Sequence, residues 1–553
     1  MHIPFIDIFA GPGGLGEGFS RFGSFRGRDV HFQSRLSIEK DAVASKTLSL
    51  RAFVHQFEGS DLPEEYYRVI RGQAELYELR KYDQWEAAQG RVWNAELGRV
   101  AEASLHLRIR EALSGAKQWV LLGGPPCQAY SLVGRSRMTG LGAVLSHDDL
   151  DEDSIKRIET DRLNKFYNDH RHRLYREYLR IVAVHQPSVF VMENVKGLLS
   201  SRIPDPERAD EFIPVFKQMR EDLSNPWTAL ENDELFDELD GFRQGKRYRY
   251  KLFSFVLPRE DDVELRDRDF LIRCENFGIP QARHRVIILG LREDIEGTPA
   301  SLTPLNSVDL RSVLGGLPRL RSGVSRVSDN AQNWLGALRF ELDQCDRDTL
   351  NALGILEKYE SISQRTKTDL ERGDAFLPHV TKAKASSELT RWLADERLEG
   401  IIQHETRTHM ASDLRRYLFA ALATEKLGST PKLQHWPEGF LPSHRNIRDA
   451  KTNKVKVRGF GDRFRVQAMQ LPSTTITSHI SKDGHYYIHP DPEQCRSLTV
   501  REAARLQTFP DNYYFVGNRT QQYQQVGNAV PPFLALQLAS IVSELFDPEN
   551  ADG

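Results

Sequence analysis

The sequence predicts an α/β protein built on a parallel, doubly wound sheet, with a smaller second region inserted late in the chain. Short apolar runs rich in β-branched residues alternate with longer helix-spaced segments, which is typical of strand–helix–strand units. A glycine loop follows the first of these runs and precedes a helical segment. At 553 residues the chain is also too long for one ordinary hydrophobic core, so a large domain and a smaller one are expected.

Five apolar runs are expected to form the strands of this sheet. Residues 3–9 form the first strand, residues 10–14 a tight loop, and a helix begins at Leu15. The other strands are expected in the runs RLSIEK, QWVLLGGPP, PSVFVMENV and RHRVIILGL, with a helix in HRLYREYLRIVAVH. Ligands of such sheets bind at the carboxyl ends of the strands, so the residues that follow these runs are the first candidates for a site.

The strand–helix rhythm fades after about residue 305, which suggests a domain boundary. We expect residues 1–305 to form the large domain, with an insertion at about 57–93. Residues 306–470 form the smaller region, with helices in SELTRWLADERLEGIIQ and ASDLRRYLFAALATEKLG. Residues 471–553 return to the large domain and end in the helix VPPFLALQLASIVSELF.

Composition favours a soluble enzyme. Charged residues make up 28% and hydrophobic residues 39% of the chain, as in ordinary globular proteins. The amino terminus lacks a basic segment followed by an apolar stretch, and no apolar run approaches membrane-spanning length, so a cytoplasmic protein is expected. The four cysteines are far apart and without ligand spacing, which argues against a disulfide framework and against a bound metal.

Charge is distributed unevenly although the formal net charge is only −3. Residues 443–465 carry eight Lys or Arg against two Asp, whereas residues 221–240 are strongly acidic. The basic stretch is therefore a candidate for contact with phosphate groups, and a solvated surface loop is the alternative.

Two patterns at expected strand ends fit a nucleotide-like cofactor. Residues 11–16, GPGGLG, match GxGxxG between a strand and a helix, and glycine lets the backbone approach a ligand closely. Glu39 closes the next strand, where its carboxylate can accept both hydroxyls of a ribose. Any adenosine-containing cofactor would fit, and a glycine turn without a ligand is the alternative.

Cys127 lies in GGPPCQAYS, directly after an expected strand. Most unpaired cysteines are small buried hydrophobes. Here two prolines fix the backbone and two glycines let it turn, so the thiol is expected at a strand end rather than in a core. A cysteine held in this way is a candidate nucleophile.

Four further polar residues have both structural and functional interpretations. Glu193 follows an apolar strand, where a carboxylate needs a partner, although it could also begin a helix. Arg283 and Arg285 are two residues apart at a strand start and could form a salt-bridge network. Asn528, in QQVGNAVPP, could cap a helix.

Taken in order, these motifs resemble those of the DNA (cytosine-5)-methyltransferase family. FIDIFAGPGGLGEGF, GGPPCQAYS, MENV, FGIPQARHRV, SLTVREAARLQTFPDNYYF and QVGNAVPP follow one another as in that family. The resemblance covers Phe5 to about Gly290 and again about Pro472 to Phe546. It implies a Rossmann-like domain that binds S-adenosylmethionine, and a smaller target-recognition domain in the region between.

The resemblance also assigns the catalytic residues. Cys127 would attack C6 of a flipped-out cytosine, and Glu193 would bind N3 and the exocyclic amino group. Arg285 would hold the cytosine O2, and Arg283 would orient Glu193 or contact a phosphate. Methylation at C5, loss of the C5 proton and elimination of Cys127 would then give 5-methylcytosine.

The family's cofactor contacts carry over to residues at the strand ends and at the last turn. The chain departs from the family at Lys40, where a large apolar residue often stacks on adenine, and Glu96 in NAELG is the candidate for the adenine contact. The expected cofactor-binding residues are Phe9, Gly11, Gly13, Glu39, Glu96, Pro126, Asn528 and Val530.

Double-stranded DNA is the partner that the resemblance implies, with a restriction endonuclease or defence system as a genetic partner. Residues 131–145, after the nucleophile, are expected to close over the flipped base. Sequence recognition is expected within residues 291–480. The expected DNA contacts are Gln128, Ser131, Arg135, Arg137, Thr475 and Ile476.

Three alternatives stay open at this point. A tRNA cytosine-5 methyltransferase would use the same motifs, although the large region at 291–480 favours duplex DNA. A catalytically silent DNA-binding regulator would keep the basic stretch without the chemistry. A nicotinamide-dependent oxidoreductase would explain GPGGLG and Glu39 but would leave Cys127, Glu193 and Arg285 without a role.

Overall fold

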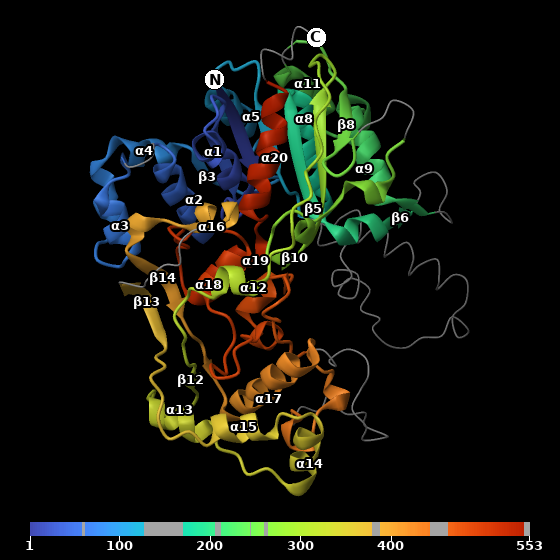
Figure 1. The fold of residues 1–553 in the computed structure, drawn as a ribbon. Coiled ribbons are helices and arrows are strands. Elements are labelled where there is room, and N and C mark those ends of the chain that lie inside the picture. The colour runs from blue at the N-terminus through green and yellow to red at the C-terminus, as the bar shows by residue number, and fades with distance from the viewer. Residues whose placement is uncertain are drawn as a thin grey trace.

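The computed structural model describes residues 1–57, 61–126, 170–204, 212–243, 245–258, 264–378, 387–442 and 463–546. These residues form a lobe that contains a large sheet and a distal lobe that is mostly helical (Figure 1). The amino terminus lies at the end of the sheet lobe that is remote from the distal lobe (Figure 1). The expected α/β class is confirmed.

The large sheet is mixed and has eight strands. All five expected strands are present as β1, β2, β4, β5 and β11. The strands β3, β2, β1, β4 and β5 are parallel neighbours in that order. In spatial order the strands are β3 (Val92–Asn94), β2 (His31–Glu39), β1 (His2–Ile8), β4 (Val120–Gly123), β5 (Val189–Val195), β11 (His284–Arg292) and β8 (Tyr250–Ser254), with β9 (Leu271–Arg273) beside β11.

The expectation of a wholly parallel sheet is wrong for β11, which is antiparallel to both β5 and β8. After β8 the chain forms β9, which pairs antiparallel with the first residues of β11. The chain then turns back and continues into β11 itself. A parallel strand would need a crossover to the opposite end of the sheet, and the chain makes none here. The first residues of β11 therefore lie at the edge where β5 ends.

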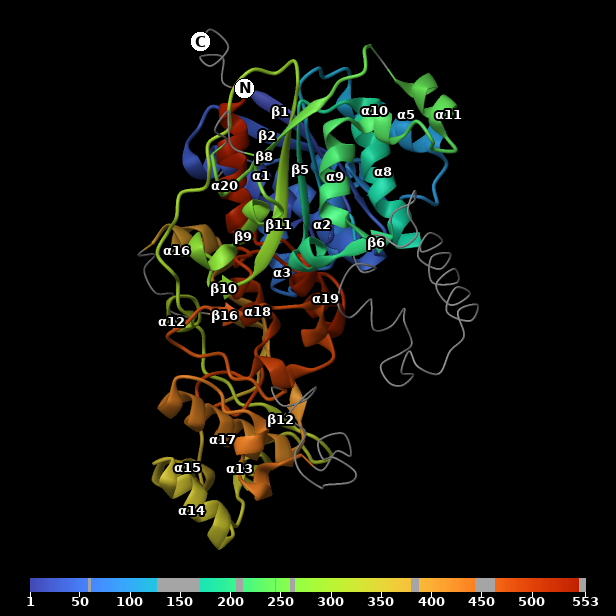
Figure 2. The same cartoon turned by 90° about the vertical axis from the view of Figure 1, so that its right-hand side faces the viewer.

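Helices cover both faces of the sheet, as the doubly wound prediction requires. Successive strand residues alternate between two hydrophobic clusters, so that Phe5 and Val120 belong to one and Ile6 and Leu121 to the other. The first cluster lies under α1 (Gly14–Arg26) and α20 (Pro532–Glu544). The second lies under α5 (Glu102–Leu113), α8 (His170–His185) and α9 (Val215–Ser224) (Figure 2).

The insertion folds as a small helical unit with its own core. After α2 (Ala42–Val54) come α3 (Glu64–Ile70), the 3₁₀ helix η2 (Leu76–Lys81) and α4 (Asp83–Gly90). Phe53, Tyr66, Tyr67 and Ile70 are buried together in a cluster that also contains Leu398. The insertion thus packs against a segment more than 300 residues away in the chain.

The distal lobe has a separate hydrophobic cluster that runs from Val324 to Cys495. The expected helix at 411–428 is present. The cluster is built around α17 (Ala411–Leu427), packed against α13 (Ala331–Leu338), α14 (Gln344–Ala352) and α15 (Leu356–Ser363).

The hydrophobic clusters differ from the predicted boundaries at 306 and 470. Leu310 and Trp392, both inside the predicted smaller region, are buried in the core of the sheet lobe. The helix expected over 387–403 is instead α16 (Glu388–Leu393), η7 (Glu396–Leu398) and the strand β14 (Gly400–Glu405). The helix ends at Leu393, and the indole of Trp392 within it is buried in the sheet lobe, where it donates to the carbonyl of Thr508.

The other elements are short, apart from two helices near the carboxyl end. They are β6 (Arg202–Pro204), η4 (Lys196–Ser200), β7 (Phe212–Pro214), α10 (Pro226–Ala229), α11 (Phe236–Phe242), η5 (Asp267–Phe270), η6 (Cys274–Asn276), β10 (Gln281–Ala282), α12 (Leu310–Leu314), β12 (Gly323–Val324), β13 (Gly373–Pro378), β15 (Thr408–His409), η8 (Leu433–His435), η9 (Glu438–Phe440), β16 (Ser473–Thr474), η10 (Ser478–Ser481), η11 (Gly484–Tyr487), α18 (Val500–Leu506) and α19 (Arg519–Asn528).

One stretch, Arg519–Glu544, is long and apolar enough to pass a test for a membrane span by length and composition alone. Within the structure 89% of its apolar window is buried. It is also interrupted, because α19 ends at Asn528 and α20 begins at Pro532. The stretch is therefore built as core helices of the sheet lobe.

Close packing between β11 and β5 predicts the effect of a single methyl group. A Cβ at Gly290 would lie 2.1 Å from the ring of Phe190, whereas a Cβ at Gly241, an exposed helix position, would meet nothing within 4 Å. Gly290→Ala should lower the free energy of unfolding by about 1–3 kcal/mol through overpacking. Gly241→Ala should leave it unchanged or raise it slightly. Thermal unfolding followed by circular dichroism compares the two, and equal midpoints would contradict the expectation.

Candidate active site

Five segments meet at one edge of the large sheet. The ends of β1, β2, β4 and β5 lie side by side in register, so the residues that follow them are neighbours. Because β11 is antiparallel, Arg285 near its start pairs with Val195 at the end of β5. This edge faces the distal lobe (Figure 2).

The glycine loop after β1 has the backbone that its sequence demands. Phe9, Gly11 and Gly13 have φ angles of 55°, 58° and 96°, the left-handed region that favours glycine. A Cβ at Gly14 would lie 2.2 Å from the carbonyl oxygen of Val530, so this glycine lets the loop pack against the turn between α19 and α20. Two expected parts of the cofactor site, the first loop and the last turn, are thus in contact.

Glu39 binds the glycine loop through its carboxylate. One oxygen accepts a hydrogen bond of 2.8 Å from the backbone N–H of Gly11, and the other accepts one of 2.7 Å from the N–H of Asp41. Burial raises the pKa of Glu39 above its usual value, and these two donors act in the opposite direction. The carboxylate is therefore held in one orientation at the end of β2.

Asp7 is a buried acid that the sequence analysis did not single out. It lies in β1 and is only 2% exposed, with Gly16 donating a backbone hydrogen bond to it. Burial, and then the nearby Glu39 carboxylate, raise the pKa of Asp7 to about 7. An aspartate inside an otherwise apolar strand was the signal available for it.

Glu96 lies on the loop after β3, next to the end of β2. The side-chain amide of Asn94 donates to the carbonyls of Glu39 and Lys40, which holds the two strand ends together. Glu96 lies 3.7 Å from the ammonium of Lys40 and 3.1 Å from the guanidinium of Arg99. The residue that departs from the family pattern, Lys40, is thus an ion-pair partner of the candidate adenine contact.

Glu193 and Arg285 form an ion pair at the centre of the edge. The Nε of Arg285 lies 2.6 Å from a carboxylate oxygen of Glu193, and the two side chains are 12% and 15% exposed. Each charge therefore has a partner and retains some access from outside. A Cβ at Gly124 would lie 2.7 Å from the other oxygen of Glu193, so only glycine at that position leaves room for the carboxylate.

The loop that leads to Cys127 is tied to β5. The side-chain amide of Asn194, which is 3% exposed, donates a hydrogen bond of 3.1 Å to the carbonyl of Pro125. Pro126 is half-buried and is the last described residue of this loop. Cys127 itself lies outside the described residues. The segment up to Pro126 is nevertheless fixed beside Glu193 by two contacts, at Gly124 and Pro125.

Arg283 differs from its expected role. It is 1% exposed, so it cannot contact a phosphate, and its hydrogen bonds go to backbone carbonyls rather than to Glu193. The distances are 2.7 Å to Ile476, 3.2 Å to Gly527 and 2.8 Å to Ala529. Arg283 therefore joins three chain segments behind the site.

The last turn presents one polar side chain. Asn528 is exposed at the end of α19, whereas Val530 is 7% exposed and packs against the glycine loop. The alternative that Asn528 caps the following helix is wrong, since α20 begins after Pro531 without a side-chain cap.

The expected DNA contacts are partly contradicted and partly outside the described residues. Ile476 is fully buried, and its backbone pairs with Gln281 and Arg283, so its side chain cannot contact DNA. Thr475 donates its hydroxyl to the carbonyl of Ala282 at 2.7 Å and is half-buried. The remaining expected contacts lie outside the described residues; these are Gln128, Ser131, Arg135 and Arg137.

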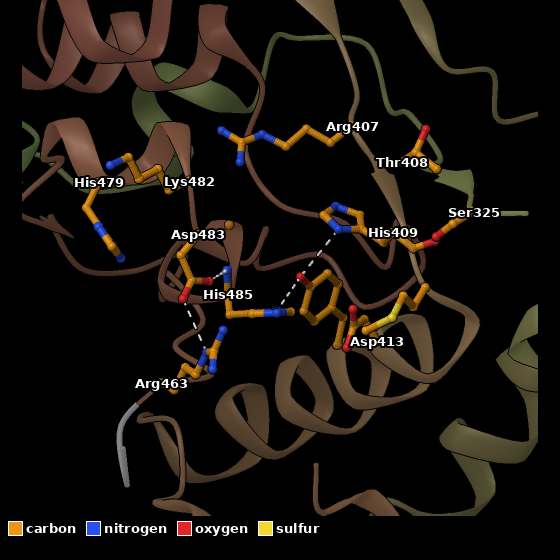
Figure 3. Close-up of a pocket in the computed structure, with 13 residues that line it drawn as sticks. Ser325, Arg407, Thr408, His409, Asp413, Arg463, His479, Lys482, Asp483 and His485 are labelled. Carbon is orange, nitrogen blue, oxygen red and sulfur yellow. Dashed lines mark hydrogen bonds and ion pairs between the residues drawn. The ribbon is translucent and has the colours of Figure 1, made fainter. Parts of the chain in front are cut away.

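A pocket of about 440 Å³ opens between η10, η11 and the strand that follows β14. Figure 3 shows Arg407, Thr408 and His409 along one side of it and His479 and Lys482 along another. Two further groups close its far side. Arg463 lies there 3.2 Å from Asp483, and the Tyr417 hydroxyl is 2.8 Å from Nδ1 of His485 (Figure 3).

This pocket is rich in cations and was not recognised from the sequence. His404 and His409 are buried and make hydrogen-bond contacts with the hydroxyls of Thr499 and Ser497. The signal for the pocket was weak, because its residues come from four separate stretches of the chain.

Comparison with known proteins agrees with this geometry. The model of the family "C-5 cytosine-specific DNA methylase" matches residues 160–220 and 270–544, more than half of the chain. The chain is 28% identical to the type II methyltransferase M.Bpa9945I of Bacillus paralicheniformis, over 98% of this chain and 99% of that one. It is 25% identical to the DNA (cytosine-5-)-methyltransferase M.ApeKI of Aeropyrum pernix, over 98% of each chain. The solved structure of the methyltransferase EhMeth of Entamoeba histolytica aligns with a TM-score of 0.38 at 12% identity, over 99% of each chain.

The raised pKa of Asp7 predicts a pH dependence of stability. Between about pH 4, where an unfolded aspartate titrates, and about pH 7, the folded protein binds one more proton than the unfolded chain. Stability therefore falls as the pH rises through this window, and Asp7→Asn should remove the effect.

The measurement is urea unfolding at pH 5 and pH 8. The stability of Asp7→Asn relative to the unmodified protein should increase by on the order of 2 kcal/mol between the two values. Asp29→Asn, at an exposed position, is the matched control. The same difference at both pH values would show that Asp7 does not hold the extra proton.

Proposed function

The chain belongs to the C-5 cytosine-specific DNA methylase family, and we propose that Cys127, Glu193 and Arg285 carry out the reaction of that family. The reaction transfers a methyl group from S-adenosylmethionine to C5 of cytosine in DNA. The ion pair of Glu193 and Arg285 beside the loop that leads to Cys127 is the observation that supports the proposal most strongly.

Cys127 adds to the cytosine ring in the first step. Its thiolate forms the Sγ–C6 bond while Glu193 protonates or hydrogen bonds N3, which receives the electron density of the broken C5–C6 double bond. C5 is then nucleophilic and becomes methylated. Loss of the C5 proton to a base and cleavage of the Sγ–C6 bond restore the aromatic ring and the free cysteine.

Arg285 has two tasks in this scheme. Its Nε holds the carboxylate of Glu193 in place, as the distance of 2.6 Å indicates. Its Nη1 donates to the carbonyl of His284 at 2.8 Å, and the remaining N–H groups of the guanidinium are donors for the cytosine O2. Arg283 keeps the positioning role that its carbonyl contacts support.

The cofactor residues fit S-adenosylmethionine, which supplies an electrophilic methyl group when bound. The open left-handed loop at Gly11, around which a Cβ would meet nothing within 4 Å, leaves room for a ligand. Glu39 at the end of β2 is oriented to accept the ribose hydroxyls, and Glu96 lies beside it for the adenine. Phe9, Gly13, Pro126, Asn528 and Val530 border the same edge.

The distal lobe reads the DNA sequence in this proposal. His479 and Lys482 are exposed at its pocket, and Arg407 lines it with a guanidinium that donates to the carbonyl of Ile480 and lies over the ring of Tyr523. Lysine and arginine side chains at such a surface bind the phosphate backbone. The basic residues 443–462 lie outside the described residues, and Arg463, which follows them in the sequence, lines the pocket. The expected boundary of the recognition region at 306–470 stays a prediction.

The partner and the location follow from the relatives. M.Bpa9945I carries the name of a type II methyltransferase, which supports a cognate restriction endonuclease as genetic partner and action on DNA in the cytoplasm. The family match favours DNA over tRNA as the substrate, and a catalytically silent regulator would not need the Glu193–Arg285 pair.

Cytosine methylation in a methylation-free host tests the proposed function. Base-resolution sequencing should find 5-methylcytosine at one recurring motif when the unmodified chain is expressed. Cys127→Ser should abolish it, because a hydroxyl is a far weaker nucleophile than a thiolate. Methylation that persists in Cys127→Ser would reject this cysteine, and none from soluble unmodified protein would reject DNA as its substrate.

Gly124→Ala tests the geometry around Glu193. The added methyl group would lie 2.7 Å from the carboxylate and must displace it, so kcat should fall by about a hundredfold. Gly336→Ala, a helix position where a Cβ meets nothing within 4 Å, is the control. Circular dichroism should show both variants folded. Full activity of Gly124→Ala would mean that the orientation of Glu193 seen here is not the one used in catalysis.

A further inference from the structure

The insertion at residues 57–93 packs on a segment that leads to the pocket of the distal lobe. Tyr66, Tyr67 and Ile70 of α3 share a buried cluster with Leu398 and Ile402. Leu398 lies two residues before the start of β14 at Gly400, and Ile402 lies within the strand. Figure 1 shows α3 and α4 on the side of the sheet lobe above β13 and β14. The insertion therefore extends the core onto this strand.

Two side chains, Tyr67 in α3 and Arg71 at its C-terminal cap, make directional contacts with the same segment. The hydroxyl of Tyr67 donates to Asp395 at 2.9 Å. Arg71, whose side chain is 7% exposed, donates to the carbonyl of Leu398 at 3.2 Å and to that of Arg397 at 2.5 Å. These carbonyls lie in the 3₁₀ turn η7 and have no strand partner there, so Arg71 supplies their hydrogen bonds.

The segment is also tied to the sheet lobe near the cofactor loop. The side-chain amide of Asn512 donates to Asp395 at 2.5 Å, and Arg51 donates to Asn512 at 3.2 Å. Arg51 in turn forms a buried ion pair of 2.7 Å with Glu17 at the start of α1. Asp395 therefore receives hydrogen bonds from the insertion and from the sheet lobe.

From this anchor, β14 runs directly to the pocket. Only two residues separate its last residue, Glu405, from Thr408, and Arg407, Thr408 and His409 line the pocket. The strand is held on its way by β13 and by Arg501, which donates to the carbonyl of Ile402 at 3.1 Å. The start of β14 and Arg407 are thus joined by one short strand, so the contacts at residues 395–398 help to set where Arg407 lies.

We propose that the insertion is a positioning element for DNA recognition, which uses Tyr67 and Arg71 to fix the start of β14 and thereby the pocket side formed by Arg407, Thr408 and His409. This inference rests on the proposed function, in which the pocket binds DNA. It gives the insertion a role in substrate affinity that is separate from the chemistry at Glu193.

Arg71→Ala tests the positioning role, with Arg68→Ala as the matched control. Arg68 lies in the same helix, but its side chain is 46% exposed and pairs with Glu78 inside the insertion. Arg71→Ala should raise KM for duplex DNA by about five- to twentyfold, as expected for lost hydrogen bonds from a charged group. The values of kcat and of KM for S-adenosylmethionine should stay within about twofold, whereas Arg68→Ala should change none of the three.

Hydrogen exchange gives a readout that does not depend on activity. Amide exchange in residues 400–409 should be faster in Arg71→Ala and unchanged in Arg68→Ala. Unchanged exchange there would overturn the positioning role. Faster exchange with an unaltered KM for DNA would also overturn the inference, because the pocket side would then have no part in DNA binding. Absence of DNA methylation by the unmodified protein would instead reject the proposed function.

A double-mutant cycle separates Tyr67 from general loss of stability. Tyr67→Phe removes one hydroxyl and should fold even if Arg71→Ala does not. Tyr67→Phe and Asp395→Asn should each raise KM for DNA, and the double variant should be no worse than the more severe single variant, because both remove the same contact. Strictly additive effects would show that the contact itself does not position β14.

Discussion

The candidate site depends on the burial of one guanidinium group. Arg283 binds carbonyls of Ile476, Gly527 and Ala529, residues that follow it by about 190 to 250 positions. Burial lowers the pKa of Arg283 to about 9, so the group is still charged at neutral pH, and the nearby Glu193 favours that charge. Without it the carbonyls of Ile476 and Gly527 would lose this donor, at a cost of about 1–3 kcal/mol for each buried group left unpaired, whereas Ala529 would keep its hydrogen bond from Gln507. The end of the recognition region and the last turn are both held by this residue.

Residues next to Arg283 also join separate segments of the chain. Gln281 accepts from the N–H of Ile476 at 2.8 Å and donates to Gln507 at 2.6 Å, so both side-chain polar atoms join separate segments. The strand then reverses into β11, and Arg285 reaches Glu193. Within five residues the chain passes from structural contacts to the centre of the site. The two arginines of this motif therefore have different roles. Arg283 is buried and binds backbone carbonyls, whereas Arg285 lies at the edge of the site.

The sequence predicted the strands of the large sheet but not their directions. Apolar runs reveal which residues are buried, and all five expected strands are present. The direction of a strand depends on the path by which the chain returns to the sheet, here after β8. The local periodicity of the sequence does not indicate this path, so β11 was expected to be parallel. That error matters, because a parallel β11 would place Arg285 at the opposite edge from Glu193. The ordered motifs nevertheless placed both residues on the same cytosine, and in the structure they form an ion pair.

The roles of residues could be predicted where they follow from the chemistry of the side chain. They were missed where they depend on packing against segments far away in the chain. Glu39 and Glu193 need partners at strand ends, and the structure provides them. Ile476 is buried where the side chains of Gln281 and Arg283 bind its backbone, so the expected contact of its side chain with DNA is wrong. The same holds for the insertion, whose charged sequence suggests a surface segment although two tyrosines of α3 are buried against a strand far away in the chain.

The two lobes have separate hydrophobic cores. Glu193 lies at an edge where the register of the strands fixes the side chains. Gly124 beside it leaves no spare room around the carboxylate. The distal lobe has its own hydrophobic cluster, so its surface can change without disturbing that edge. Such independence has a cost, because a separately folded lobe must still be held in one place relative to the base that reacts. Arg283 holds the return of the chain to the sheet lobe, and the insertion holds β14 on its way to the pocket. Arg283 and the insertion thus hold the chain at two different places, one at Ile476 and the other at residues 395–398.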